Sequence, residues 1–548
     1  MSLRRSHLRR LEDGVFDVLI VGGGINGAVS AACLAARGVR VALLEAKDFA
    51  SVTSQESSNL AWGGIKYMES YEFGLVRKLC MSRNHLIRSY PSTVQEIRFY
   101  TMRPRHFRHS LWLLVLGTWL YWAIGNFFTK RPRLLRRATI AREEPLIDLA
   151  ESTAGFEYSD AYLHDNDARF VWNFIRGALD HGAVAVNYVE STHAERANDG
   201  LWTTQAIDRT TGQRLTIRSR VRVNACGPYV DTVNQGSGVG TAHHHVFSKG
   251  VHLIVRRLTN SRRVLTFFAD DGRLFFVIPM GPRTCIGTTD TRVDGPDTEM
   301  NDGDRRFILD NINKRLRLST PLSTADIIAE RCGVRPLVVS KAGSSHSDWM
   351  QLSRKHVVEV DPERGHISIF GGKLTDCLNV GEEVGAAIAR MGIAVPFPRA
   401  RWYGEPSEQT RQEFVHQATL MRLDAMTSPR SSEPLTSRLW RRYGAEALGL
   451  LEEIRADPGQ AEVLIAGAEY LRCEIAHAAR REMIVKLEDF LRRRSKIALV
   501  IAKHELAQAP GLRTACELLF GEHAEREWAA YFADTTARPS LNADLTAP

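Results

Sequence analysis

Residues 16–45, FDVLIVGGGINGAVSAACLAARGVRVALLE, decide the fold class of this chain. Residues 16–21 form a largely apolar run with β-branched side chains, which indicates a buried parallel strand. Small helix-forming residues follow over 28–37, and residues 39–44 read as a second strand. The order strand, helix, strand predicts a Rossmann-like α/β unit at the start of the chain.

Three glycines join the first strand to the helix in the spacing G-x-G-x-x-G. Gly22 permits a tight turn, Gly24 lets the backbone approach a pyrophosphate, and Gly27 lets helix and strand pack closely. The helix N-terminus offers N–H groups and a partial positive charge to phosphates. Glu45 follows about 20 residues on, where a carboxylate can accept hydrogen bonds from ribose hydroxyls. These features predict dinucleotide binding, although the motif alone does not separate FAD from NAD.

The size and charge of the chain limit the number of domains and the kinds of partner to expect. With 548 residues it is too long for one hydrophobic core, so we expect two or three domains. The net charge of +9 favours anionic partners, namely phosphorylated substrates, an anionic membrane surface or nucleic acid. Since no zinc-finger or helix-turn-helix pattern stands out, we expect no nucleic-acid partner.

The eight cysteines are scattered and form no C-x-x-C pair. Neither a metal site nor a disulfide framework is therefore expected, and the thiols should be free in a reducing compartment. The basic N-terminus, MSLRRSHLRRLEDG, lacks the apolar segment of a secretory signal.

Residues 111–128, LWLLVLGTWLYWAIGNFF, are the most apolar run in the chain. As a helix this run would approach the roughly 20 residues that span a bilayer. Its tryptophans Trp112, Trp119 and Trp122 suit the headgroup level, and basic residues flank it on both sides, whereas a spanning helix usually carries its basic flank on one side. The pattern favours a helix lying in the membrane interface, with a core helix and a spanning helix as alternatives.

Small residues recur after the first unit, at the ends of expected strands and in one polar loop. Small hydroxyls and glycines suit backbone held close to a flat ring or to phosphates, although an ordinary polar loop is the alternative. An antiparallel sheet is expected between about 245 and 330, and the chain is helical by period over 405–530. The small residues concerned are Ser54, Ser57, Ser58, Gly63, Gly64, Ala225, Gly227 and the turn Gly371-Gly372.

Ten short motifs occur in the order expected of FAD-dependent glycerol-3-phosphate dehydrogenases, the aerobic, quinone-linked family that the chain resembles over about residues 14–505. A further segment, EDFLRRRSKIAL at 488–499, resembles the C-terminal helical domain of that family. The ten motifs are VGGGINGA, TSQESSNL, GGIKYMESYEFGLV, GFEYSD, NACGPYV, KGVHLIV, FFVIP, IGTTD, GVRPL and FGGKLT.

The resemblance implies a fold, an activity and partners. The α/β fold would combine a discontinuous FAD-binding domain, an inserted antiparallel β-sheet cap domain and an α-helical C-terminal domain. The enzyme would oxidise sn-glycerol 3-phosphate to dihydroxyacetone phosphate by hydride transfer to flavin N5 of a noncovalently bound FAD, and would pass the electrons to membrane quinone. A homodimer is left open. The implied boundaries are 14–75, 150–240 and 331–395 for the FAD domain, 76–149 and 241–330 for the cap, and 400–535 for the helical domain.

The resemblance also bears on residues 111–128. The segments before and after this run would complete one FAD domain on one side of the membrane, so a crossing is not expected. Peripheral or monotopic attachment at the cytoplasmic face of the inner membrane is the localisation it implies.

Site roles follow by match to the motifs of the family. Arg335 of GVRP would grip the phosphate, and His252 of KGVH is the candidate base. Lys373 of GGKLT would stabilise a reduced flavin or bind a substrate oxygen, while Tyr67 and Lys66 would contact substrate. The residues expected to bind the cofactor are Gly22, Gly24, Gly27, Glu45, Ser54, Ser57, Ser58, Gly63, Gly64, Ala225, Gly227, Gly372, Lys373, Leu374 and Thr375.

One loop departs from the pattern of the family, which typically reads SSKLIHGGLRYL where this chain reads SSNLAWGGIKYM. Asn59, Trp62 and Lys66 replace a lysine, a histidine and an arginine, and Arg-to-Lys is not conservative at a phosphate site. Another polyol phosphate or a hydroxy acid therefore stays open as substrate. An oxidase that uses oxygen, and a flavin-binding membrane protein without turnover, are the remaining alternatives.

Overall fold

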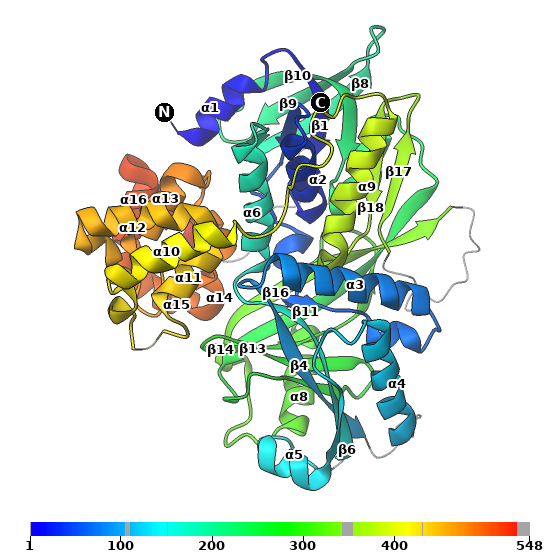
Figure 1. Cartoon of the computed structure of the whole chain (residues 1–548), viewed down its shortest axis with the longest axis vertical. Coiled ribbons are helices and arrows are strands. Elements are labelled where there is room, and N and C mark those ends of the chain that lie inside the picture. Colours follow the sequence, from blue (N-terminus) through cyan, green and yellow to red (C-terminus); the bar gives the residue numbers. More distant parts are fainter. Residues whose placement is uncertain (1, 105–109, 151, 342–354, 430, 534–548) are drawn as a thin grey trace.

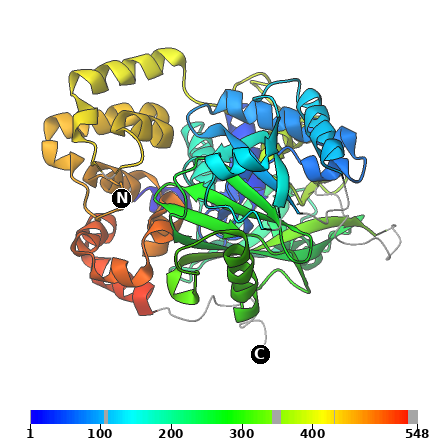
Figure 2. The same cartoon turned by 90° about the horizontal axis from the view of Figure 1, so that it is seen from below.

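The computed structural model describes residues 2–104, 110–150, 152–341, 355–429 and 431–533. Figures 1 and 2 show three parts: two sheet-based parts stacked along the long axis, and a helical part at their side. This arrangement confirms the predicted fold class of an α/β FAD-binding fold with a second sheet and an α-helical C-terminal domain.

The first sheet is the Rossmann-like part. Its strands lie in the order β17-β18-β10-β1-β2-β7, and β1 pairs in parallel with β2 and with β10. The hairpin β8–β9 continues the sheet from β10 in antiparallel register. The bounds are β1 Val15–Val21, β2 Val41–Leu44, β7 Val184–Val186, β8 Val189–Arg196, β9 Trp202–Asp208, β10 Arg214–Asn224, β17 Val357–Asp361 and β18 His366–Phe370.

The second sheet follows the order β15-β11-β14-β13-β12-β4-β6-β3, with β16 paired to β11 and β5 to β6. Three strands that the sequence boundaries assign to the FAD domain, β3, β6 and most of β16, lie in this sheet. Strand β6 pairs with β3 and, along its length, with β4, and β16 pairs with β11. The bounds are β3 Leu60–Ala61, β4 Val94–Pro104, β5 Arg133–Arg136, β6 Ser152–Leu163, β11 His243–Arg256, β12 Val264–Phe268, β13 Leu274–Met280, β14 Arg283–Gly287, β15 Thr291–Val293 and β16 Ile327–Ser340.

Helices complete the three parts. The first of the C-terminal helices form their own apolar cluster around Phe414, Leu439 and Leu451, whereas the later ones, with Ile497 and Leu512, share a cluster with the second sheet. The helices outside the first sheet's core are α1 Leu3–Arg10, α3 Phe73–Ser89, α5 Arg137–Glu143, α7 Val230–Gly236 and α8 Asp302–Arg315, and those of the helical part are α10 Glu408–Leu420, α11 Leu435–Tyr443, α12 Ala447–Ala456, α13 Arg472–Arg481, α14 Ile497–Val500, α15 Lys503–Gln508, α16 Pro510–Phe520 and α17 Ala524–Ala533.

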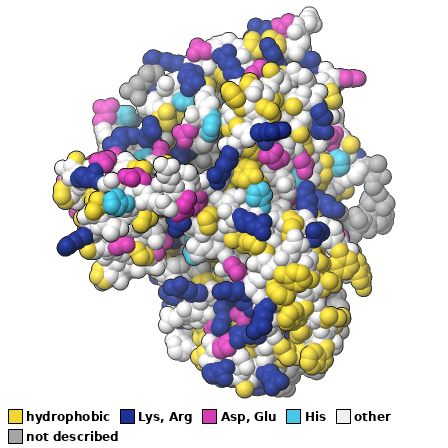
Figure 3. All heavy atoms as spheres, in the orientation of Figure 1, with side chains coloured by type: hydrophobic (Ala, Val, Ile, Leu, Met, Phe, Trp, Pro, Cys, Tyr) yellow, Lys and Arg dark blue, Asp and Glu magenta, His cyan; other side chains and the backbone are white. Residues whose placement is uncertain are grey.

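The apolar run predicted at 111–128 begins as helix α4, Leu111–Ile124, with Ser110 as its N-cap. Trp112 is 72% exposed and Leu116 is 65% exposed, and Figure 3 shows a broad apolar surface where Figure 1 places α4. Within α4 only Thr118 and Tyr121 are buried, so this is not a core helix. In the part of the chain that the structure describes, no helix combines the length and the hydropathy needed to cross a membrane.

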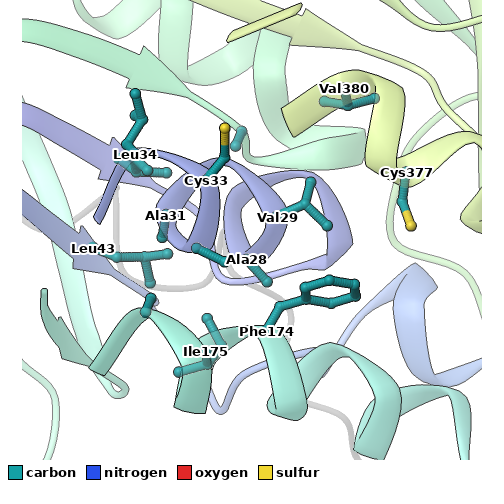
Figure 4. Close-up of a cluster of buried hydrophobic side chains, with 14 of the residues drawn as sticks. Ala28, Val29, Ala31, Cys33, Leu34, Leu43, Phe174, Ile175, Cys377 and Val380 are labelled. Atoms are coloured by element: carbon teal, nitrogen blue, oxygen red, sulfur yellow. The ribbon is translucent and has the colours of Figure 1, made fainter. Parts of the chain in front are cut away.

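Two helices, α6 Asp167–Asp180 and α9 Cys377–Arg390, pack against α2 Ile25–Ala36, the helix that follows β1. Figure 4 shows Phe174 of α6 and Val380 of α9 beside the small side chains of α2. Every residue of α2 except Ile25 is buried, because alanines, glycine and serine let two helices and the sheet approach it closely. This packing fixes the N-terminus of α2 over the carboxyl end of β1.

Candidate functional site

The glycine turn after β1 is tight enough to require glycine at two positions. A Cβ on Gly27 would lie 1.9 Å from the carbonyl oxygen of Gly22. Gly22 itself has φ +104°, and a Cβ there would lie 2.5 Å from the carbonyl oxygen of Ala225. The turn therefore brings bare backbone and the N-terminus of α2 together, as a phosphate site needs.

Glu45 contacts that turn directly. Its Oε2 accepts a hydrogen bond of 2.7 Å from the Gly23 amide, and its Oε1 accepts one of 2.8 Å from the Lys47 amide. Burial raises the pKa of Glu45 above its ordinary value, while the two amides act in the opposite direction. The carboxylate thus fixes the shape of the turn, and its contact with a ribose stays a prediction.

The polar segment after β2 reaches the same helix end. Ser54 Oγ accepts a hydrogen bond of 3.1 Å from the Ile25 amide in the first turn of α2. Thr53 Oγ1 donates to the Val334 carbonyl of β16 over 2.8 Å, and the Ser57 amide donates to Asp167 Oδ2 over 2.9 Å. Ser58 is half-buried in the same segment. The segment therefore lies between the first sheet and the second.

A second glycine turn, Gly371-Gly372, follows β18 with φ values of +61° and +113°. The Gly371 carbonyl accepts a hydrogen bond of 3.0 Å from Asn26 Nδ2 of α2, so the two glycine turns are neighbours. A Cβ on Gly371 would lie 2.5 Å from Val338 Cγ2 of β16. The predicted residues Gly372, Leu374 and Thr375 therefore lie near the N-terminus of α2.

Lys373 continues this turn and reaches the loop at 59–68. Its Nζ donates a hydrogen bond of 2.8 Å to the Tyr67 hydroxyl and lies 4.2 Å from the centre of the Tyr67 ring. Thr375 Oγ1 donates to the Trp62 carbonyl over 3.4 Å. Trp62 and Tyr67 have ring centres 6.3 Å apart. The loop that contains Gly63 and Gly64 is thus bound to the turn after β18.

The strands β11 and β16 place four polar side chains on one face of the second sheet. Ser248 pairs with Arg335 and His252 pairs with Arg331, and directly opposed residues share a face. Between these pairs Gly250 lies opposite Gly333. A Cβ on Gly250 would lie 2.1 Å from Arg335 Nη2, so the Arg335 guanidinium occupies the hollow above this glycine.

Arg335 has polar contacts beyond that hollow. Its Nη2 donates to Thr288 Oγ1 over 3.0 Å, its Nη1 donates to the Thr289 carbonyl over 3.2 Å, and the same Nη1 lies 3.4 Å from Asp290 Oδ1. The last three residues of the motif IGTTD, at 286–290, thus hold Arg335. Because Asp290 is partly exposed and the guanidinium is about one quarter exposed, an anion can compete for this arginine.

His252 is buried beside the two arginines. Neither ring nitrogen has a hydrogen-bond partner among the described residues. Burial, then Arg335, then Arg331 lower the pKa of His252 to about 3. An unpartnered, neutral imidazole on this face is available to a ligand that approaches the sheet.

The three residues of the altered loop have different surroundings. Asn59 is buried with φ +59°, and its Nδ2 donates to the carbonyls of Leu163 and Asp165 while its Oδ1 accepts from Arg331 Nη1. Trp62 lies against Tyr67, whereas the Lys66 side chain is exposed. Asn59 therefore binds backbone carbonyls, and Trp62 packs against the tyrosine that Lys373 contacts. The catalytic role of Lys66 stays a prediction.

One neighbour of the site was not singled out from the sequence. Arg331 is fully buried, donates to Asn59 and the Ser57 carbonyl, and lies 3.6 Å from Asp167. The available signal is its spacing of four residues from Arg335, which puts both side chains on one face wherever the segment is extended.

The residues present fit a dinucleotide with a flat ring system. The two glycine turns expose backbone that a Cβ would fill, the α2 N-terminus lies between them, and the orphaned imidazole of His252 lies on the facing sheet. The glycine turns and the polar segment would hold the phosphates and ribose, and Lys373 and the loop at 59–68 would border the ring.

Comparisons with known proteins agree with this geometry. The family model described as "FAD dependent oxidoreductase" matches residues 17–359, and the model of the "C-terminal domain of alpha-glycerophosphate oxidase" matches residues 400–526. A glycerol-3-phosphate dehydrogenase of Pseudomonas tolaasii is 31% identical over 90% of this chain and 93% of its own length. A D-erythritol 1-phosphate dehydrogenase of Brucella abortus is 29% identical over 90% of this chain and 96% of its own length.

A solved structure shares the fold over nearly the whole chain. The glycerol-3-phosphate dehydrogenase from Bacillus halodurans, determined in complex with FAD, superposes with a TM-score of 0.70 at 24% identity. The match covers 97% of this chain and 96% of that protein.

Proposed function

The chain belongs to the FAD-dependent oxidoreductase family that includes the glycerol-3-phosphate dehydrogenases, and from that premise we propose that it oxidises sn-glycerol 3-phosphate to dihydroxyacetone phosphate. FAD is its cofactor. The observation that carries the proposal is the face shared by β11 and β16, which holds Arg335 and His252, while Val338 of β16 meets the glycine turn that leads to Lys373.

FAD supplies, when bound, the acceptor for the hydride that leaves the carbinol carbon. The side chains of this protein must then bind the phosphate, remove the hydroxyl proton and orient the carbon. Arg335, His252 and the Lys373–Tyr67 pair fit these three tasks.

Arg335 is the group that fits the phosphate. Its guanidinium presents a planar fork to a dianion, and it already contacts hydroxyl, carbonyl and carboxylate oxygens that a phosphate oxygen can replace. A Cβ on Gly250 would lie 2.1 Å from Arg335 Nη2, so this glycine is what lets the guanidinium lie against the sheet in position for a ligand. We expect the phosphate to anchor the substrate at this point of the sheet.

His252 is the group that fits the proton. It is neutral at pH 7 because its pKa lies near 3, so a ring nitrogen can accept the hydroxyl proton. A base with so low a pKa is weak, but Arg335 is one cause of the lowering. A phosphate dianion on Arg335 would offset that charge, raise the pKa of His252 and strengthen the base when substrate is present.

Lys373 and Tyr67 fit the third task. The ammonium group holds the Tyr67 hydroxyl at 2.8 Å, which leaves the hydroxyl proton available for donation to a substrate oxygen. The positive charge at the end of the glycine turn also favours any negative charge that develops beside it. Trp62 borders this pair. Where the family typically has a histidine, this chain has a larger apolar ring, which changes the shape of this part of the site.

We propose a membrane quinone as the electron acceptor and the cytoplasmic membrane face as the location, and helix α4 supports contact with a membrane. Its exposed side chains include Trp112, Leu113, Leu116, Trp119 and Leu120, a larger apolar surface than isolated exposed residues provide. Arg77, Lys130 and Arg131 border this helix in sequence or space and are exposed, which suits anionic headgroups. We propose that α4 lies in the membrane interface.

A single anaerobic experiment tests the substrate. Glycerol 3-phosphate at saturating concentration should bleach the flavin absorbance of the purified holoenzyme, and a menaquinone or ubiquinone analogue should restore it. In a separate assay with oxygen present, stoichiometric hydrogen peroxide without added quinone would instead identify an oxidase. No bleaching by any polyol phosphate would support a flavin-binding protein without turnover.

A second substrate has specific support. The relative from Brucella abortus is named for D-erythritol 1-phosphate, and the loop with Trp62 departs from the pattern typical of glycerol-3-phosphate dehydrogenases. The bleaching experiment should therefore include four-carbon polyol phosphates. A kcat/KM at least tenfold above that for glycerol 3-phosphate would assign the longer substrate.

A further inference from the structure

The motif DFLRRR, residues 489–494, has no role in the reaction proposed above, yet it is buried throughout. Asp489–Arg494 forms a single π-helical turn, and every one of its side chains is buried. Buried arginines are rare unless paired, and π-helical turns occur frequently at functional sites. Three consecutive buried arginines therefore call for a specific partner.

The first partner is Asp48, three residues after Glu45. Arg494 binds Asp48 through two nitrogens, Nη1 to Oδ2 at 2.7 Å and Nη2 to Oδ1 at 2.8 Å. Arg493 Nε adds a third contact to Oδ2 at 2.7 Å. Although burial acts to raise it, Arg494 and Arg493 hold the pKa of Asp48 below its ordinary value. The carboxylate at the start of the polar segment is thus bound by the helical part of the protein.

The other partners lie at the far end of the same segment. Arg493 Nη1 donates to Gln55 Oε1 over 3.3 Å, and Arg492 Nη2 donates to Glu56 Oε2 over 3.0 Å. Glu56 Oε2 also accepts from the Cys332 amide of β16 over 3.1 Å. The six-residue motif therefore holds both ends of residues 48–56.

Between these two ends lies Ser54, whose Oγ accepts the hydrogen bond from the first turn of α2. The helical part thus fixes a polar side chain that meets the helix N-terminus expected to face the pyrophosphate. Arg494 also lies over the Trp172 ring at 4.4 Å, which leaves the guanidinium little freedom. The DFLRRR turn therefore holds its arginines in fixed positions that face residues 48–56.

We infer that the DFLRRR turn is a positioning element for the cofactor: the docked C-terminal helical domain holds residues 48–56 in the conformation that binds FAD. FAD affinity and docking of the helical domain are then coupled, so that each strengthens the other. The inference goes beyond the proposed oxidation and is independent of which polyol phosphate is the substrate.

The first test measures FAD affinity and not activity. In Arg494→Lys the positive charge remains, but one ammonium cannot reproduce the two parallel contacts to Asp48. We expect the dissociation constant of FAD, measured by fluorescence as apoprotein takes up flavin, to rise about tenfold, within the roughly 5–150-fold usual for couplings between sites. Glu56→Gln should act in the same direction.

The matched control is Arg480→Lys. Arg480 is an exposed residue of the helical part that pairs with Glu453 and does not contact the polar segment. Its FAD dissociation constant should stay within twofold of the wild-type value. If Arg494→Lys and Glu56→Gln destabilise the apoprotein but leave FAD affinity within the same twofold range, the turn joins the domains only, and the inference is overturned.

A second test needs no variant and covers the case in which Arg494→Lys does not fold. Hydrogen exchange of the wild-type chain is compared with and without FAD. Coupling requires that FAD slow exchange in residues 485–499 of the helical part as well as in 45–58. Protection confined to 45–58 would contradict the inference.

Discussion

Lys373 Nζ donates a 2.8 Å hydrogen bond to the hydroxyl of Tyr67, a residue 306 positions earlier in the chain. Neighbouring residues in the sequence do not bring the two together, because Lys373 belongs to the turn after β18 and Tyr67 to a short 3₁₀ helix, Ile65–Met68. Their contact joins the turn that would border the flavin to the loop that departs from the pattern of the family. It is the polar contact on which the orientation of the substrate depends in our proposal.

Tyr67→Phe removes the hydroxyl and leaves the Lys373 ammonium without that acceptor. Since a hydrogen bond to a charged group contributes about 1.5–3 kcal/mol, kcat should fall roughly tenfold or more, with a smaller change in KM. Stopped-flow reduction of the flavin measures the chemical step directly. Ser70→Ala, which removes an exposed hydroxyl that donates to the Tyr67 carbonyl, is the control, and an equal loss there would contradict the assigned role.

Arg335→Lys keeps a charge but loses the planar fork. KM for the phosphorylated substrate should rise roughly 10–100-fold, because contacts between a guanidinium and a phosphate are charge-assisted and bidentate. Slow oxidation of unphosphorylated glycerol should change by less than threefold, since it makes no use of the fork. Arg317→Lys, at an exposed arginine outside the site, should leave both rates unchanged. Equal effects on both substrates would remove the phosphate role.

His252 makes stability depend on pH in one direction. Its pKa is lowered to about 3 in the folded protein, so below its ordinary value of about 6.5 the unfolded chain takes up a proton that the folded chain does not. The contribution of His252 to the free energy of unfolding is fully present above pH 6.5 and is lost as pH falls toward 3. Its slope is up to about 1.4 kcal/mol per pH unit. In His252→Gln that part of the slope should be absent.

Urea unfolding of the apoprotein at pH 7, 5.5 and 4.5 measures this difference. His164 and His366, whose pKa values are lowered to about 4 and about 3, contribute equally to wild type and variant, so they cancel. His193→Gln, at an exposed histidine, provides the control and should keep the wild-type slope. A His252→Gln variant with an unchanged slope would show that the imidazole is not held neutral.

Gly27→Ala tests the first glycine turn. The added methyl group would lie 1.9 Å from the Gly22 carbonyl oxygen, closer than any packing allows, so α2 must move away from β1. We expect the purified protein to lack the visible absorbance of bound flavin, at a yield close to wild type. Gly74→Ala, at a glycine with open space around its Cβ position, should remain yellow. A yellow Gly27→Ala protein would show that the turn can relax.

Trp112→Ser combined with Leu116→Ser tests the surface of α4. Burying each side chain in an interface contributes roughly 1.5–3 kcal/mol, so the partition constant onto vesicles with anionic lipid should fall at least 100-fold. Sedimentation of protein with vesicles measures the partition. Leu420→Ser, at a similarly exposed leucine of α10, is the control and should sediment as wild type does. Equal losses in both variants would mean that α4 is not the membrane contact.

The sequence by itself determined the local units. Apolar runs, glycine spacing and the acid at Glu45 predicted the β1–α2–β2 unit, and the structure confirms it with parallel pairing of β1 and β2. These units can be predicted because strands, turns and helices depend on residues that are neighbours in sequence. The spacing of apolar side chains and the conformational freedom of glycine can both be seen in that sequence. The resemblance carried by ten motifs then predicted the family and the cofactor.

Only the tertiary structure decided which distant residues meet. No local pattern could show that Arg492–Arg494 would bind Asp48 and Glu56. Nor could one show that β6 and β16 would pair within the second sheet and not within the first. Likewise, the composition of 111–128 was compatible with a core helix, and its exposure followed only from which side chains the rest of the chain covered. Contacts across hundreds of residues result from the packing of whole elements, and packing depends on shape and charge in three dimensions, which the linear order of residues does not express.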